Sequence, residues 1–335
     1  IPIRRYGDGA TVTPGTDEKY NWVGLAPFEK LLSIYNPKHG FVYTANFNED
    51  KAPNDVLIAQ DFVGLYRQKR LKKLLQSKDK FTSQDFINFQ NDYFTEEAAE
   101  LLPLMLEYVK EKAPSNINPE IFSLLENWDY HLTQKSIGGT LYKIWCEETI
   151  KEILYQYIDK EFLQPYLDSS SFDLSRLFKL YGNKSLELEE LLLKTLQKTI
   201  KFLSEKLSSD YHKWNWGNLH KTILVHPFSL ASDEAAALNI GPFKTGGDGN
   251  TLNNGYYAPS NNYQVIVGPS VRQIHDLSDW DKSICVIPGG QSGLPFHRHY
   301  KDLMKLWARG KYIPFLFSRD AITKHLEGTF KMLPK

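Results

Sequence analysis

The stretch PGGQSGLPFHRHY, residues 288–300, has the residue types of a serine hydrolase. Ser292 stands between glycines, and His297 and His299 follow closely. A nucleophile elbow reads G-x-S-x-G, because the second glycine lets a helix pass close to the strand that carries the serine. Here that glycine comes one residue early, and Pro295 disfavours a helix directly after the serine. The stretch therefore predicts a tight glycine turn, and the nucleophile of any hydrolase must lie elsewhere.

Two other stretches carry residues that could do chemistry. The loop GGDGNTLNNG, residues 246–255, offers candidate oxygen ligands for a cation, namely Asp248, Asn250 and Asn253. Their spacing does not match an EF-hand loop, so a glycine-rich connection is the favoured interpretation. Asp276 follows His275 as in a catalytic dyad, but no nucleophile is near in sequence, and we expect Asp276 to pair with Arg272 or with the backbone.

The composition limits the classes of partner. The chain has 335 residues, with 40 Lys+Arg and 40 Asp+Glu, so its formal net charge is zero. This balance gives no support for nucleic acid or an anionic membrane as partner. No run reaches the roughly 20 apolar residues of a membrane helix. Cys146 and Cys285 are far apart, which favours two buried thiols over a disulfide. The opening Ile1-Pro2-Ile3, without Met or signal peptide, suggests a piece of a longer protein.

The elements that must position any site fall into three segments. Residues 1–80 are β-rich with a following helix, residues 81–210 form a helical lobe, and residues 211–335 return to short strands. Thr82 and Asp85 predict a capping box. An amphipathic helix is predicted between Ser185 and Asp210 by apolar residues three and four apart: Leu192, Leu196, Ile200, Leu203 and Leu207.

The same pattern predicts an α+β protein in which one sheet is interrupted by a helical insertion and then resumed. Residues 40–46 and 263–287 are expected to share this sheet, because short apolar strands at both ends of the chain cannot bury both faces alone. The later part contains these candidate strands: Tyr263–Val267, Val271–Leu277, Lys282–Ile287 and Lys311–Phe317. One helix, about His299 to Arg309, interrupts them.

Four stretches resemble a known family when they are taken together, in this order and at this spacing. They are PGTDEKYNWVGLAPFEKLLSIYNPKHGFVYTANFNED, DFVGLYRQKRLKKLL, WNWGNLHKTILVHP, and GPSVRQIHDL with ICVIPGGQSGLPFHRHYKDLMKLWARGKYIPFLF. They are similar to the C-terminal part of the β chain of the penicillin acylase family, whose members are N-terminal-nucleophile (Ntn) amidohydrolases. The resemblance implies part of an Ntn-hydrolase αββα sandwich, interrupted by the helical insertion.

The resemblance also implies where the nucleophile is. In this family it is the first serine of the β chain, uncovered by autocatalytic cleavage of a precursor, and its own α-amine takes up the hydroxyl proton. An α-amine titrates close to working pH, which suits a general base. Such a serine would lie upstream of this chain, since Ile1 has no hydroxyl. The chain alone is therefore expected to be inactive.

Family resemblance assigns an oxyanion donor to the stretch TANFNED. The donor is expected to be Asn48, with Asn46 as the alternative. An Asn side-chain N–H at a rigid strand end can stabilise the oxyanion of a tetrahedral intermediate without carrying a charge. Without the family, the simpler interpretation is that both residues make a turn, since Asn tolerates left-handed backbone.

Arg67 is the second residue that the resemblance implies, close to the β-chain amine and the polar end of the substrate. A guanidinium there could lower the pKa of the amine and orient a carboxylate. Arg70, one turn later, is the alternative. The run of Lys and Arg from Arg67 to Lys73 is also typical of a solvated basic face.

Many family members hold a structural Ca²⁺ between their two chains. Ca²⁺ takes six to eight oxygens, including carboxylates and backbone carbonyls. The resemblance places ligands near the carbonyl of Gly9 and at Asp55 or Asp61. The remaining ligands would come from the rest of the protein, and no cofactor is required for the chemistry.

The function that the resemblance implies is cleavage of the acyl-amide bond of a small molecule, such as a β-lactam side chain or a related N-acyl amide. The alternatives are an acyl-homoserine-lactone acylase of the same family and a non-catalytic binding module derived from it. The expected partners are the α chain and the N-terminal part of the β chain of the same precursor. The expected compartment is periplasmic or extracellular.

Overall fold

The computed structural model describes residues 1–9, 11–31, 33–46, 65–112, 117–169, 174–175, 178 and 186–334. The chain divides into two units, Ile1–Ser77 and Lys78–Lys335. Among the described residues no helix has both the length and the apolar character needed to cross a membrane. Cys146 and Cys285 are both free thiols, as expected, but only Cys146 is buried, and Cys285 is partly exposed.

The first unit contains a small hairpin and one helix. Strand β1 (Pro2–Arg4) pairs antiparallel with β2 (Trp22–Leu25), and α1 (Tyr66–Leu75) follows later in the chain. One 3-10 turn, η1 (Glu18–Tyr20), lies between β1 and β2, and a second, η2 (Phe28–Lys30), lies between β2 and α1. Every residue of β2 is exposed, so the side chains on both faces of that strand meet solvent. A two-stranded ribbon with no buried face is marginally stable alone.

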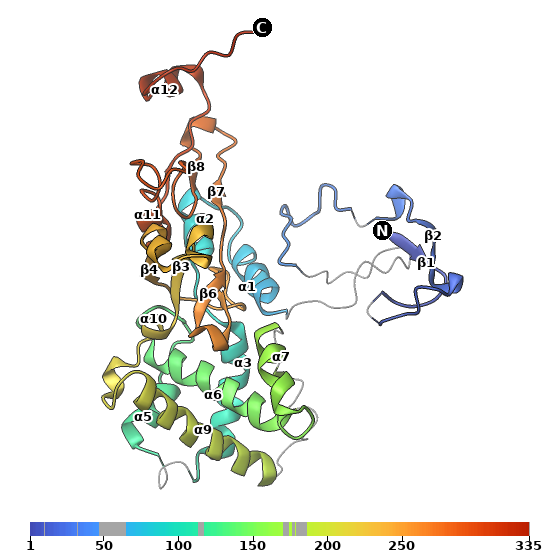
Figure 1. Ribbon diagram of the computed structural model, residues 1–335, viewed down its shortest axis with the longest axis vertical. Helices are drawn as coiled ribbons and strands as arrows, with labels where there is room; N and C mark the ends of the chain where they lie inside the picture. The colour runs from blue at the N-terminus through green and yellow to red at the C-terminus, as the bar shows by residue number, and fades with distance from the viewer. Residues whose placement is uncertain are drawn as a thin grey trace. The chain divides into compact units, whose positions relative to one another are not determined.

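The second unit begins with helices, which gather at one end of it except for α2, which lies beside the strands (Figure 1). They are α2 (Ser83–Gln90), α3 (Glu96–Val109), α5 (Pro119–Glu126), α6 (Ile137–Leu154), α7 (Lys160–Ser169) and α9 (Leu186–Lys206). The predicted capping box is confirmed at α2, where the Thr82 side chain accepts from the Asp85 N–H and the Asp85 side chain accepts from Thr82. The predicted amphipathic helix is α9, with Leu192, Leu196 and Leu203 fully buried.

Helices α6 and α9 build the main core through satisfied polar groups as well as apolar side chains. Trp145 Nε1 donates to the carbonyl of Leu192 over 3.0 Å, and the hydroxyls of Thr149 and Thr195 lie 2.9 Å apart. Buried polar groups of this kind must be paired to avoid a desolvation penalty. At the other face of α6, Gly138 lets α5 approach so closely that an added Cβ would lie 2.4 Å from the Leu124 carbonyl oxygen.

The strands of the second unit form two small sheets toward its other end (Figure 1). One has the order β4-β3-β6-β5 and the other the order β7-β8-β9. The strands are β3 (Lys221–Leu224), β4 (Ile240–Lys244), β5 (Tyr256–Tyr257), β6 (Gln264–Val267), β7 (Arg272–Ile274), β8 (Ile284–Val286) and β9 (Ile313–Pro314). Short helices precede, join or follow these strands: α10 (Trp216–Leu219), α11 (Met304–Ala308), α12 (Arg319–Lys324), η3 (Tyr211–Lys213), η4 (Pro227–Leu230), η5 (Asp233–Leu238), η6 (Pro259–Asn261) and η7 (Trp280–Lys282).

One expectation about the sheets was wrong. Residues 40–46 form no strand, so they share no sheet with residues 263–287. The strands within 263–287 themselves divide between the two sheets, since β6 pairs with β3 and β5 whereas β7 pairs with β8. A short apolar run predicts which side chains will be buried, but it does not identify the strand that will pair with it.

The glycine-rich loop, residues 246–255, is tied to the helical part at several points. Trp216 Nε1 donates to the Gly247 carbonyl over 2.9 Å, and the Asn253 N–H donates to the Asp92 carbonyl over 2.9 Å. The buried His220 ring contacts the carbonyl of Gly255 at 2.8 Å. These bonds hold the backbone on both sides of Asp248.

Candidate functional site

Asn46 and Arg67, two of the residues expected near the active site, are in direct contact. Arg67 Nη2 donates to Asn46 Oδ1 over 2.8 Å. Arg67 lies in the first turn of α1 and is half-buried, so it is not part of a fully solvated face. Asn46 has a φ of 61°, the left-handed conformation that Asn adopts more readily than most residues. The turn and the side-chain contact are thus both present at this position.

The other predicted site residues are only partly covered by the structure. Asn48, Asp55 and Asp61 lie outside the described residues. Gly9 is described, and an added Cβ there would lie 2.9 Å from the guanidinium carbon of Arg4. In the described part of the chain no group of three or more His, Cys, Asp or Glu could hold a metal, so calcium binding stays a prediction.

Ser292 has the surroundings of a turn residue. Its hydroxyl accepts the Leu294 N–H over 3.2 Å, and its own N–H donates to the His299 carbonyl over 3.0 Å. The His299 ring is engaged by Asp302, with Nδ1 and Oδ2 2.7 Å apart. Residues 288–300 are all described, and within them no histidine ring is hydrogen-bonded to the Ser292 hydroxyl. The geometry agrees with a scaffold role for this motif.

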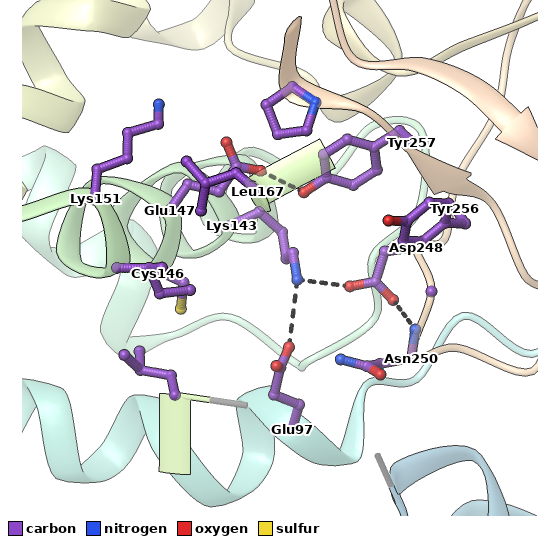
Figure 2. A pocket seen from close by; sticks show the side chains of 14 residues that line it. Glu97, Lys143, Cys146, Glu147, Lys151, Leu167, Asp248, Asn250, Tyr256 and Tyr257 are labelled. Atoms are coloured by element: carbon purple, nitrogen blue, oxygen red, sulfur yellow. Dashed lines mark hydrogen bonds and ion pairs between the residues drawn. The ribbon is translucent and has the colours of Figure 1, made fainter. Parts of the chain in front are cut away.

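A buried charge cluster lines a cavity of about 110 Å³ in the second unit. Figure 2 shows Lys143 of α6 between two carboxylates, Glu97 of α3 and Asp248 of the glycine-rich loop. The Lys143 Nζ lies 2.8 Å from Asp248 Oδ2 and 3.3 Å from Glu97 Oε2. On another side of the cavity the Tyr257 hydroxyl donates to Glu147 over 2.6 Å. Both ion pairs are almost inaccessible to solvent, since Glu97 is 5% and Asp248 1% exposed.

The protonation states of the cluster follow from burial and from the ratio of charges, since one lysine faces two carboxylates. Burial raises the pKa of Glu97, the Lys143 charge opposes this, and the Asp248 charge adds to it. Burial alone would lower the pKa of Lys143, but the charges of Asp248 and Glu97 outweigh it and raise that pKa well above its usual value. Burial also raises the pKa of the Cys146 thiol. Lys143 therefore stays charged and Cys146 stays a thiol, so neither is a nucleophile.

The cluster thus joins α3, α6 and the glycine-rich loop and does not supply a reacting group. Reasoning from sequence missed Lys143, Glu97 and Glu147, and treated Asp248 only as a candidate metal ligand. The sequence carries a signal for Lys143 and Glu147, because both lie on α6, where residues are buried on every turn from Gly138 to Leu154. A charged residue on a helix with so little exposed surface needs a buried partner of opposite charge.

Comparison with known proteins gives a consistent result. The family model described as Penicillin amidase matches residues 1–324. An acyl-homoserine lactone acylase, QuiP, of Pseudomonas aeruginosa is 24% identical over 356 residues, which cover 94% of this chain and 42% of that protein. The penicillin acylase 2 proenzyme of a Pseudomonas species is 24% identical over 350 residues, covering 100% of this chain and 44% of the proenzyme.

A more distant relative and a solved structure agree with these matches. Penicillin G acylase of Escherichia coli is 23% identical over 349 residues, covering 91% of this chain and 39% of that protein. The structure of a thermostable penicillin G acylase from Alcaligenes faecalis superposes with a TM-score of 0.59 at 16% identity, covering 100% of this chain and 64% of that one. The chain spans less than half the length of these curated relatives. The mixed helix and sheet fold is that of an Ntn hydrolase.

Proposed function

Because the chain belongs to the penicillin amidase family, we propose that it is part of an amidohydrolase that cleaves the acyl-amide bond of a small molecule. The substrate class is a β-lactam side chain or a related N-acyl amide. The family match over residues 1–324 is the observation that carries this proposal. The contact between Asn46 and Arg67 supports it, because it brings together two groups that oxyanion stabilisation and substrate orientation would use.

The proposed reaction proceeds through an acyl-enzyme. A serine hydroxyl from outside this chain attacks the amide carbon, and the amine of that serine takes the hydroxyl proton. The carbonyl oxygen becomes an oxyanion, which accepts a hydrogen bond from the side-chain amide of Asn48 or Asn46. The C–N bond then breaks, the leaving amine takes the proton, and water releases the carboxylic acid from the serine. Arg67 holds the Asn-bearing segment and adds positive charge near the site.

The proposed partner is the rest of the same precursor, which would cover the first unit. Trp22, Phe28 and Tyr35 are 65%, 82% and 96% exposed there. Large apolar side chains exposed close together in sequence are typical of a surface that another chain buries. Obligate interfaces of this kind resemble a core cut in half. An α chain and an upstream β-chain segment would supply that cover.

A second candidate, an acyl-homoserine-lactone acylase, is favoured by the relatives that carry this name in several Pseudomonas species. The two functions cleave the same type of bond, an amide, and differ in the acyl group and in the amine that is released. The whole precursor should be produced and assayed with a chromogenic phenylacetyl amide and with a long-chain N-acyl-homoserine lactone. Faster hydrolysis of one of these two substrates assigns the substrate class.

The same experiment can reject the proposal. An amidohydrolase of this family should appear as two chains, with a serine at the new N-terminus, as checked by mass and N-terminal sequencing. A precursor that stays uncut and leaves both substrates intact would favour a non-catalytic binding module. Production of residues 1–335 alone serves as the control, and we expect it to hydrolyse neither substrate.

A further inference from the structure

An open cleft of about 630 Å³ lies in the second unit, apart from the buried charge cluster. It is lined by residues of α2, the 91–93 and 133–135 segments, the end of β4 and the end of α11. Figure 1 places α2, α11 and β4 in the same region of this unit, and Tyr312 of the 308–312 segment donates to Gln90 of α2 over 2.8 Å. Sites for small organic molecules have volumes of this order.

The charged side chains of the cleft all have the same sign. They are Lys135, Lys244, Arg309 and Lys311. No Asp or Glu is among the lining residues, and within the described chain none of these cations forms an ion pair. Lys244 Nζ instead donates to Asn218 Oδ1 over 2.6 Å. A cleft lined by one sign of charge concentrates ions of the opposite sign.

A further cation lies beneath the cleft. Arg272 of β7 is only 5% exposed and is held by neutral acceptors, the Trp307 carbonyl at 2.8 Å and Asn253 Oδ1 at 2.7 Å. Asp276, which was expected to pair with Arg272 or with the backbone, accepts from the backbone N–H of Ser278. Among the described residues no carboxylate pairs with Arg272, and its buried Nε has no hydrogen-bond partner.

Arg272 is close enough to the cleft for its charge to act there. It lines a small inner cavity, and the walls of that cavity and of the cleft share four residues: Tyr93, Thr245, Gly246 and Ala308. A buried charge without a counter-ion is costly. An anion in the cleft would supply the missing negative charge through this shared wall, where screening by water is weak.

The wall that carries two of the cations is rigidly placed. Gly310 has a φ of 64°, and an added Cβ would lie 2.2 Å from Asn91 Oδ1. Asn91 Nδ2 in turn donates to the Ile87 carbonyl of α2 over 2.8 Å. Only glycine fits this turn, which directs the chain so that Arg309 and Lys311 both line the cleft.

We propose that this cleft binds a small molecule bearing at least two negative charges on oxygen, of the phosphate or polycarboxylate class. The cations outnumber the single charge of a simple carboxylate, and the amide side chains of Gln84, Asn88 and Gln134 line the same walls as further hydrogen-bond donors. Arg and amide groups together are the usual ligands of such oxyanions. All residues that line this cleft belong to the second unit, and its proposed ligand does not depend on the amidohydrolase proposal.

Isothermal titration calorimetry of the purified protein, residues 1–335, at low ionic strength tests the site. The probes are inorganic pyrophosphate and citrate, with acetate and chloride at equal ionic strength for comparison. We expect saturable binding of pyrophosphate or citrate, and none of acetate or chloride. The tighter of the two probes identifies the phosphate or the polycarboxylate class.

Matched variants distinguish a site from general charge attraction. Lys135→Gln and Lys311→Gln should each weaken binding about two- to fivefold, as expected for exposed charge pairs, and the double variant about tenfold. Lys324→Gln removes the same charge from an exposed position in α12 and should leave affinity unchanged. Equal weakening by Lys324→Gln, or no saturable binding of either probe, would overturn the proposal.

Discussion

The guanidinium of Arg67 holds the carbonyl side of the Asn46 amide, with 2.8 Å between Nη2 and Oδ1. An Asn amide has an acceptor at Oδ1 and two donors at Nδ2, and the arginine can only donate. The contact therefore turns the Nδ2 hydrogens of Asn46 away from Arg67. Any oxyanion bound by Asn46 would lie on the side opposite the guanidinium.

The first prediction separates the two candidate donors. In the processed enzyme, Asn48→Ala should lower kcat by about 100- to 1000-fold, the usual effect of removing an oxyanion donor. Asn46→Ala should cost less than about tenfold, since it removes a positioning contact. Steady-state kinetics on the better substrate measures both. A larger loss for Asn46→Ala would contradict this order and assign the donor role to Asn46.

The second prediction concerns Ser292. Ser292→Ala should leave kcat/KM within about threefold of wild type, because the hydroxyl only accepts the Leu294 N–H in a local turn, and such surface changes have small effects. The same kinetic assay measures this. A loss of several orders of magnitude, with the fold intact by circular dichroism, would restore Ser292 as a nucleophile.

The third prediction tests the buried charge cluster. Lys143→Met should destabilise the protein by about 3–5 kcal/mol, because it leaves Glu97 and Asp248 buried without a counter-charge. Glu97→Gln should cost much less, since Lys143 then pairs one-to-one with Asp248. Denaturant unfolding measures both. Lys201→Met, at a side chain that is 77% exposed, is the control, and an equal effect there would refute the cluster's role.

The fourth prediction follows from the raised pKa of Glu97. The folded protein holds a proton on this carboxyl more tightly than the unfolded chain does, so its contribution to stability is complete below the ordinary pKa of 4.5. That contribution is lost as pH rises through the folded pKa. Glu97→Gln should therefore reduce the fall in unfolding free energy that occurs as the pH rises above 4.5.

Unfolding curves at a series of pH values measure this slope. Glu187→Gln, at an exposed position of α9, removes the same charge and should leave the slope unchanged. An unchanged slope in Glu97→Gln would show that Glu97 is not protonated more readily in the folded protein.

The fifth prediction concerns the contact between α5 and α6. Gly138→Ala should destabilise by about 1–3 kcal/mol, because the new methyl group would lie 2.4 Å from the Leu124 carbonyl oxygen and overpack the contact. Gly293→Ala is the control, since an added Cβ there has no atom within 4 Å. Thermal unfolding measures both, and a stabilised Gly138→Ala protein would contradict the close approach.

The helical part of the fold is readable from sequence because its signals are local. The spacing of Leu192, Leu196 and Leu203 predicts α9, and all three are fully buried. The Thr82 capping box likewise depends on residues within one turn. The sheets are not readable in this way. Strands β5 and β9 have two residues each, and their pairing depends on chain segments that the sequence pattern does not connect.

The roles of Asn48, Asn46 and Arg67 stay predictions from family position. The stretch around Asn46 and the arginine of α1 were identified together, and the structure places Asn46 against Arg67. The pairing of Lys143 with Asp248 was not foreseen, because it joins a helix to a distant loop. Of the two partners expected for Asp276, the backbone is the one observed, and Arg272 donates to Asn253.

Trp22 in strand β2 also provides an intrinsic fluorescence probe of the first unit. Trp22 is the single tryptophan of residues 1–77, and the other tryptophans of the chain belong to the second unit. Two of those, Trp145 and Trp216, are fully buried and donate to backbone carbonyls, whereas Trp22 is 65% exposed. Iodide should therefore quench the emission of Trp22 and, to a smaller extent, that of Trp280, which is 46% exposed, so a Trp280→Phe variant isolates the Trp22 signal. Loss of that quenching would report, without a label, the moment at which another polypeptide covers the hairpin.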